Sequence, residues 1–226
     1  MEIHPIAYFH SPFTSKFGIP KQAGLVADLE GEIVFEPAYR NKDALRGMED
    51  FDYLWLIWGF SANRHATKSP VVRPPVLGGN EKLGVFATRS PFRPNDIGLS
   101  SVRLSRIEWS TSRSPVIHVK GADLMDGTPI FDIKPYLVYA DSHPEARSGF
   151  VDTHKWDRLQ VIVPDEVAEY LLDHGMSHEK IEVMKEVLAQ DPRPHYQKDP
   201  HKVYGMPYEG MDIHFVVSDK TLTVQK

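Results

Sequence analysis

Residues 1 to about 139 form short apolar or β-branched runs that glycine and proline repeatedly interrupt. Runs of this length, bounded by turn residues, predict strands rather than helices. Many short strands with frequent turns favour a closed or nearly closed β-barrel. No internal repeat is evident, so a repeat fold is not expected. The expected strands cover residues 3–10, 32–35, 54–60, 83–88, 99–107, 116–122 and 130–133, with one short helix over 41–47.

The composition changes after about residue 139, where polar and small residues predict a linker over 141–157. Apolar residues then recur at helical spacing over 165–190, and Gly175 divides this stretch into two expected helices. Alternating runs at 212–217 and 221–224 predict a hairpin. We therefore expect a mainly β protein, with an N-terminal barrel over 1–140 and a small α+β domain over 158–226.

Charge and cysteine content exclude several classes of protein. The formal net charge of −5 disfavours a protein that coats nucleic acid non-specifically, although a local basic patch remains compatible with it. The absence of cysteine excludes disulfides and zinc–thiolate sites. The N-terminus has no secretory pattern, and the most apolar stretch, residues 51–60, is too short to span a bilayer. We expect a cytoplasmic protein with no membrane partner.

The densest motif is GVFATRSPFRPNDIGLS, residues 84–100. Residues 85–88 are expected to end a strand, after which Arg89 and Arg93 follow on a loop that Pro91 and Pro94 stiffen. Arginine presents a planar fork that suits carboxylates, phosphates and base edges. The motif therefore favours a binding loop. The alternative is that both arginines pair with surface carboxylates while the prolines shape a barrel corner.

A second motif, DGTPIFDIKPY, covers residues 126–136. Asp132, Lys134 and Tyr136 alternate along the expected strand, so their side chains share one face. A carboxylate, an ammonium group and a phenol on one face suit proton transfer or the orientation of a polar substrate. A solvated strand face with an Asp–Lys pair is an equally good interpretation.

A third motif, DPRPHY at residues 191–196, follows the second expected helix and holds Arg193 between two prolines. Helix termination by proline explains part of this pattern, and a rigid basic contact for phosphates or bases explains the rest. His174 and His178 lack an acidic third ligand nearby, so we expect no metal site. Neither a P-loop nor a G-x-G-x-x-G fingerprint occurs, which argues against a Rossmann cofactor site.

At these motifs the chain resembles the TsaA-like, or TrmO, family of tRNA N6-adenosine methyltransferases. The resemblance covers essentially the full chain, with the motifs in order. The matching segments are PKQAGL (20–25), RGMEDFDYLWLIWGF (46–60), VRPPVLGGN (72–80), GVFATRSPFRPNDIGLS (84–100), DGTPIFDIKPY (126–136) and LAQDPRPHY (188–196).

The resemblance implies transfer of a methyl group from S-adenosylmethionine to N6 of threonylcarbamoyladenosine, the modified base beside the tRNA anticodon. It also implies a barrel fold and a homodimer with the cofactor near the subunit interface. Many relatives place His-Gln or similar polar residues where this chain has Ser61 and Ala62, so Ala62 offers only its backbone. The implied cofactor-binding residues are Pro20, Lys21, Gln22, Ser61, Ala62, Arg89, Leu99, Asp126, Gly127, Thr128 and Pro129.

For the chemistry we hypothesise Asp132 as the base that removes the N6 proton, with Lys134 and Tyr136 orienting the substrate. Two alternatives remain: a methyltransferase of the same barrel acting on another acceptor, and a non-enzymatic S-adenosylmethionine-binding regulator. The expected tRNA phosphate contacts are Arg64, Lys68, Arg73, Arg93, Arg193 and Lys198.

Overall fold

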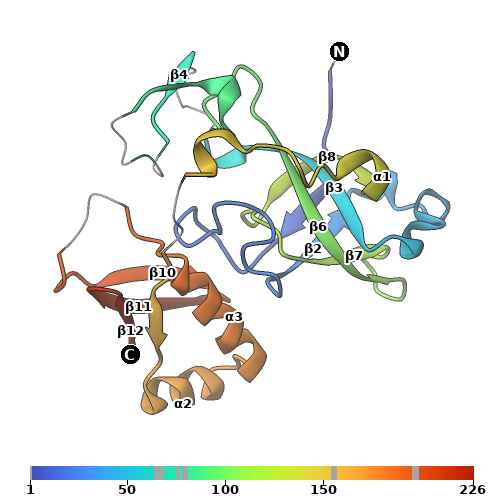
Figure 1. Cartoon of the computed structure of the whole chain (residues 1–226). Helices are drawn as coiled ribbons and strands as arrows, with labels where there is room; N and C mark the ends of the chain where they lie inside the picture. Colours follow the sequence, from blue (N-terminus) through green and yellow to red (C-terminus); the bar gives the residue numbers. More distant parts are fainter. Residues whose placement is uncertain (1, 64–68, 75–76, 78–80, 154–156, 195–198) are drawn as a thin grey trace.

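The first part of the chain folds into a closed barrel with strand order β1-β2-β7-β6-β3-β8 (Figure 1). We describe a computed structural model over residues 2–63, 69–74, 77, 81–153, 157–194 and 199–226. All six strand pairings are antiparallel, which confirms the expected non-Rossmann barrel. The barrel strands are β1 (Ala7–His10), β2 (Glu30–Phe35), β3 (Tyr53–Gly59), β6 (Ile97–Glu108), β7 (Val116–Lys120) and β8 (Thr128–Pro135).

Strand β3 shows how the sequence builds the barrel wall. Leu54, Leu56 and Trp58 are buried inside the barrel, whereas Trp55 and Ile57 alternate with them and are only partly buried. A continuous apolar run of this kind is typical of a strand buried on both faces, but here only one face is buried. The run is continuous because the outer surface of the barrel is also apolar here.

Three local expectations need correction. Residues 83–88 do not form one strand: β5 (Leu83–Gly84) pairs with β4 (Val71–Val72), and a 3-10 helix, η6 (Val85–Ala87), follows. Both the amide and the hydroxyl of Thr88 donate to the Val85 carbonyl, and these local bonds override the strand preference of the residues.

The expected helix over 41–47 is a 3-10 helix, η2 (Lys42–Leu45), in which the Asn41 side chain accepts a hydrogen bond from the Asp43 amide at 2.9 Å. Two further short 3-10 helices flank it, η1 (Pro37–Tyr39) and η3 (Met48–Asp50). Strand β1 begins at Ala7 rather than at residue 3.

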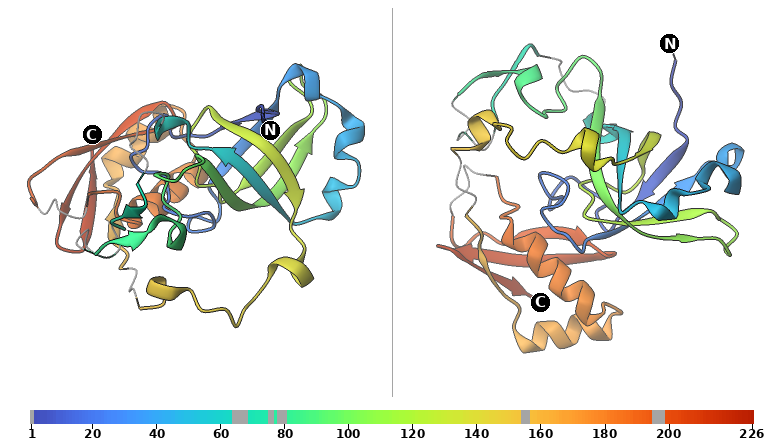
Figure 2. Two further views of the ribbon diagram at one scale, coloured as in Figure 1. Left: turned by 90° about the horizontal axis from the view of Figure 1, so that it is seen from above. Right: turned by 45° about the vertical axis from the view of Figure 1, so that its right-hand side comes forward.

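The C-terminal region is a four-stranded sheet of order β10-β11-β12-β9 with two helices packed against it (Figures 1 and 2). The two helices separate at Gly175, whose φ of +94° suits glycine, and this confirms the expected break. The hairpin over β11 and β12 is also confirmed. The elements are β9 (Gln160–Ile162), α2 (Asp165–Asp173), α3 (His178–Ala189), β10 (Tyr204–Tyr208), β11 (Met211–Ser218) and β12 (Thr221–Gln225).

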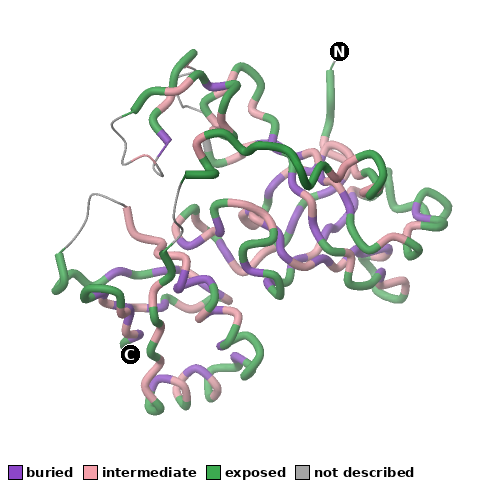
Figure 3. The backbone as a smooth tube through the Cα atoms, in the orientation of Figure 1, coloured by how far each residue is buried: buried purple, intermediate pink, exposed green. Residues whose placement is uncertain are grey.

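Two hydrophobic cores hold these regions, one inside the barrel and one in the C-terminal region (Figure 3). The segment between β1 and β2, residues 11–29, contributes to the second core although it belongs to the barrel in sequence. Phe13 packs edge-on to Tyr208 with ring centroids 5.4 Å apart, and Phe17 stacks near Tyr204 and Phe215. The C-terminal region thus fixes a loop that starts and ends in the barrel.

A single-turn helix, α1 (Val138–Asp141), ends where the expected linker begins, and a 3-10 helix, η7 (Gly149–Val151), lies within the linker. Asp141 ties α1 to the barrel by accepting a hydrogen bond from the Trp55 indole at 2.9 Å. The division into 1–140, 141–157 and 158–226 remains a prediction. Among the residues described, no helix is long and apolar enough to cross a membrane.

Candidate cofactor and substrate pocket

A pocket of about 880 Å³ opens at one end of the barrel. Its walls come from the 11–29 segment, the end of β3 with η4 (Ser61–Asn63), the loop from η6 to β6, the start of β6, and the β7–β8 connection. Segments far apart in the sequence therefore meet around one space. Of the residues predicted to bind cofactor, Pro20, Lys21, Gln22, Ser61, Ala62, Arg89, Leu99 and Thr128 line it.

Arg89 connects two walls of the pocket. Its Nη1 donates to the side-chain oxygen of Gln22 at 2.5 Å, so residues 67 positions apart in the chain hold each other in place. Arg93 also lines the pocket, and its Nη1 donates to the Thr88 carbonyl at 3.2 Å. Arg93 therefore braces the loop on which Arg89 lies.

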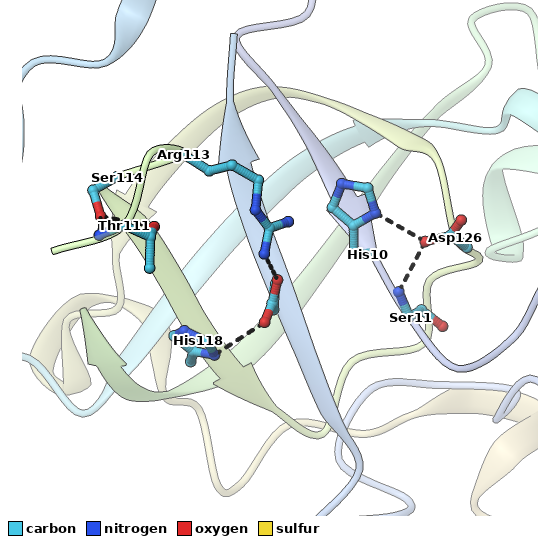
Figure 4. Close-up of polar contacts among 8 residues, drawn as sticks. His10, Ser11, Thr111, Arg113, Ser114, His118 and Asp126 are labelled. Carbon is cyan, nitrogen blue, oxygen red and sulfur yellow. Dashed lines mark hydrogen bonds and ion pairs between the residues drawn. The ribbon is translucent and has the colours of Figure 1, made fainter. Parts of the chain in front are cut away.

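The Asp126 side chain and the backbone of the β7–β8 connection both bond to β1 and the residues that follow it (Figure 4). Asp126 accepts hydrogen bonds from the Ser11 amide at 3.2 Å and from the His10 ring at 3.1 Å. Gly127 adopts a φ of +73°, and its amide donates to the Phe9 carbonyl. Only Thr128 of the predicted stretch 126–129 lies in the pocket wall, because Asp126, Gly127 and Pro129 are taken up in joining β1 to β8.

The predicted catalytic residues lie on the outer side of β8 and not among those lining the pocket. Lys134 Nζ lies 3.1 Å from Asp132 Oδ2, with both side chains about half exposed. Tyr136 follows the strand and its ring packs 5.7 Å from Trp55, which does line the pocket. Asp132 and Lys134 thus form the ion pair that the sequence offered as the alternative interpretation. Lys134 lies opposite Trp55 of β3, which lines the pocket.

The predicted tRNA-binding residues are spread over the molecule. Arg73 is exposed on the loop after β4, whereas Arg193 is partly buried and pairs through two nitrogens with Asp191 at 2.8 and 2.9 Å. Arg64, Lys68 and Lys198 lie outside the described residues.

Sequence reasoning missed one acidic residue in the pocket wall, Asp123. Its Oδ1 accepts a hydrogen bond from the Ser100 hydroxyl at 2.6 Å, and that hydroxyl accepts one from the Trp58 indole at 3.0 Å. Ser100 and Trp58 are buried inside the barrel. The only signal in the sequence was an aspartate just after a buried strand, which by itself indicates a turn.

Burial shifts the charge properties of two pocket residues. Desolvation raises the pKa of Asp123, although the Ser100 hydroxyl and the Arg89 charge act in the opposite direction. Desolvation also lowers the pKa of Lys21, against the attraction of Asp191. The pocket therefore combines cationic groups, one partly buried carboxylate and apolar walls.

Comparison with known proteins assigns both parts of the chain to one family. Residues 8–142 match the tRNA-methyltransferase O N-terminal domain, and residues 157–226 match the TrmO C-terminal domain. The chain is 38% identical over 221 residues to the tRNA (adenine(37)-N6)-methyltransferase of Escherichia coli, covering 96% of this chain and 94% of the relative. It is also 38% identical over 216 residues to a putative S-adenosylmethionine-dependent methyltransferase of Pseudomonas aeruginosa, covering 94% and 91%.

The fold agrees with solved structures of the same family. A crystal structure of TrmO superposes with a TM-score of 0.81 at 32% identity, covering 99% of this chain and 97% of that one. A TrmO structure from P. aeruginosa gives the same TM-score and identity and covers 100% of this chain and 95% of the other. With both domains matched and the barrel reproduced, this chain belongs to the TrmO family of tRNA methyltransferases.

Proposed function

We propose that this chain transfers a methyl group from S-adenosylmethionine to N6 of adenine 37 in tRNA, where the adenine carries the threonylcarbamoyl group. The observation that carries the proposal is the pocket itself. Most residues expected to bind the cofactor come together there from five separate segments of the chain. If this chain shared only its fold with the family, the residues expected to bind the cofactor would not need to line one pocket.

The pocket fits the cofactor in size and in chemistry. A volume of about 880 Å³ lies within the usual range for small-molecule sites. Ile97 and Leu99 provide apolar surface for the adenine or the methionine chain, and Arg89 provides a fork for the carboxylate. Bound S-adenosylmethionine supplies a methyl group that its sulfonium already activates.

The protein then has two tasks, positioning the acceptor and helping its proton to leave. Near-attack geometry, with N6 about 3 Å from the methyl carbon, supplies much of the rate. The N6 lone pair is delocalised into the purine and the carbamoyl group, so an acceptor for the N6 proton helps. Asp132 is our proposed base, with Lys134 and Tyr136 orienting the substrate.

The role of Asp132 has a direct test. Asp132→Asn should lower turnover at least 100-fold at saturating substrates, since general bases contribute about 10²–10⁴-fold. Binding of cofactor and tRNA should remain. Near-normal turnover would show that Asp132 is not the base.

A homodimer is part of the proposal. The outer faces of β3 and β6 expose Tyr53, Ile97 and Leu99 at 44%, 38% and 55%, and Leu99 also lines the pocket. An apolar surface that continues into the pocket is well placed to meet a second copy beside the cofactor. Light scattering coupled to size-exclusion chromatography should give twice the chain mass.

The activity is tested by methyl transfer from labelled S-adenosylmethionine to tRNA with and without the threonylcarbamoyl group. Labelling confined to the modified tRNA and mapped to adenine 37 is the expected result. Labelling of a different acceptor would favour the first alternative function. Cofactor binding without transfer to either tRNA would favour a regulator.

A further inference from the structure

Asp123 is the one acidic side chain that lines the pocket within the parts of the chain described here. It lies in the β7–β8 connection, which lines the same pocket as Met125 and the loop that carries Arg89. We propose that Asp123 binds the α-ammonium group of S-adenosylmethionine, while Arg89 binds the α-carboxylate of the same molecule. The proposal deepens the cofactor site and rests on the proposed function.

The side-chain hydrogen bonds from Trp58 through Ser100 all donate toward the Asp123 carboxylate. The Trp58 indole N–H can only donate, so Ser100 Oγ accepts from it at 3.0 Å. The hydroxyl proton of Ser100 is therefore free to point to Asp123 Oδ1, 2.6 Å away. This chain orients the carboxylate, which the backbone N–H groups of Asp123 and Ala23 also stabilise by hydrogen bonds. A carboxylate has about four acceptor sites, so it can accept a further hydrogen bond from a donor in the pocket.

The neighbouring charges match an α-amino acid. Arg89 lies near enough to Asp123 to stabilise its charged form, and both line the same pocket. In the methionine moiety an ammonium and a carboxylate are bonded to a single carbon. A carboxylate and a guanidinium in the walls of one pocket can each bind the opposite charge of that group.

The acceptor base does not offer the same match. In the threonylcarbamoyl group the threonine nitrogen is part of a urea and carries no positive charge, so only its carboxylate is ionic. A carboxylate in the wall would repel that group and attract the ammonium of the cofactor. Asp123 therefore favours the methionine end of the cofactor over the threonyl end of the tRNA in this part of the pocket.

Energetic cost also favours a binding role. Burial disfavours the charged carboxylate of Asp123. Hydrogen bonds from Ser100 and from the backbone N–H groups of Asp123 and Ala23 offset part of this cost. A cation that enters the pocket would add a further favourable interaction with the negative charge.

The test measures binding rather than turnover. Isothermal titration would compare S-adenosylhomocysteine, which keeps the amino acid group, with 5′-methylthioadenosine, which lacks it. Asp123→Asn should weaken S-adenosylhomocysteine binding about 10- to 100-fold, as expected for a hydrogen bond to a charged group. Affinity for 5′-methylthioadenosine should change less than about twofold, because that ligand lacks the ammonium.

Asp28→Asn is the matched control, since Asp28 is exposed on the barrel surface and pairs with Arg103 and Lys120. It should leave both affinities unchanged. A second measurement uses the unaltered protein: acidification that protonates Asp123 should weaken S-adenosylhomocysteine binding more than 5′-methylthioadenosine binding. This pH measurement tests the proposal even if the Asp123→Asn variant fails to fold.

Equal affinities of Asp123→Asn and the unaltered protein for S-adenosylhomocysteine would overturn the inference and leave the proposed function standing. Equal losses for both ligands would also overturn it, because they would place Asp123 at the nucleoside. Absence of binding of either ligand to the unaltered protein would instead overturn the proposed function, and the inference with it.

Discussion

The Phe13 ring packs edge-on to the Tyr208 ring, with centroids 5.4 Å apart and both side chains fully buried. Phe13 lies in the 11–29 segment of the barrel, whereas Tyr208 ends β10 of the C-terminal sheet. Residues 20–22 of the same segment line the cofactor pocket. The C-terminal core therefore supports one wall of a pocket formed mainly by the barrel.

Phe13→Ala should lower the free energy of unfolding by about 3–5 kcal/mol, because it removes a buried ring and leaves a cavity. Urea denaturation followed by tryptophan fluorescence measures the change. Tyr139→Ala is the control, since Tyr139 is 87% exposed and its removal should cost less than about 0.5 kcal/mol. Equal effects of the two substitutions would contradict the packing described.

Alanine substitutions at two glycines of the 11–29 segment distinguish the cost of steric crowding from the cost of backbone strain. Gly18 and Gly24 both have a positive φ, +93° and +82°. A Cβ on Gly18 would lie 2.3 Å from Met206 Sδ, whereas a Cβ on Gly24 would meet no atom within 4 Å. Gly18→Ala should therefore destabilise the protein by about 1–3 kcal/mol more than Gly24→Ala in thermal or urea unfolding. Matching losses would show that Met206 yields without cost.

Arg89→Lys keeps the positive charge but loses the planar fork that contacts Gln22. We expect affinity for S-adenosylhomocysteine to fall about 10-fold, with unfolding free energy changed by less than about 0.5 kcal/mol, since Arg89 is exposed. Titration calorimetry provides the affinity. Arg103→Lys, on the exposed face of β6, should leave binding intact; an unchanged affinity for Arg89→Lys would remove Arg89 from the site.

The Asp191–Arg193 pair should make stability depend on pH. Burial opposes ionisation of Asp191, but hydrogen bonds and charge from Arg193 outweigh it and lower the pKa of this carboxyl. A carboxyl with a lowered pKa in the folded state stabilises the fold above its unfolded pKa and loses that contribution as pH falls through the folded value. Arg193→Ala should thus cost about 1–3 kcal/mol at pH 7, and less below about pH 4.

Unfolding in urea at a series of pH values measures this difference. Arg158→Ala is the matched control, because the Arg158–Glu186 pair is about half exposed and should contribute less than about 1 kcal/mol. A cost of Arg193→Ala that stays constant from neutral to acidic pH would place its role in packing rather than in the ion pair.

Arg73 is the exposed arginine for which a tRNA phosphate contact is simplest to test. Arg73→Ala should weaken tRNA binding and lower the slope of log affinity against log salt by about 1. Fluorescence anisotropy over a salt series gives both values. Arg106→Ala removes the same charge from β6, seven residues beyond Leu99, and should leave the slope unaltered. An equal change in both variants would indicate a non-specific effect of net charge.

Much of the barrel was predictable because strand signals are local. The runs that became β2, β3, β6, β7 and β8 alternate or cluster apolar side chains, and the turn at Asp126-Gly127 separates the last from the others. The division of α2 from α3 at Gly175 was predictable because a positive φ is readily adopted by glycine. The resemblance to the TrmO family likewise followed from motifs that are contiguous in the sequence.

The sequence by itself determined the β-rich first part, the helical pair, the family and eight of the residues that line the pocket as expected cofactor contacts. The tertiary structure decided that residues 85–87 turn into a 3-10 helix and that residues 11–29 join the C-terminal core. It also decided that Asp123 accepts from Ser100, which in turn accepts from Trp58. The physical reason is the distance along the chain between the residues that interact. Alternation and turn preferences act over a few residues, whereas burial of Phe13 and the orientation of Asp123 depend on partners supplied by distant segments once the chain has folded.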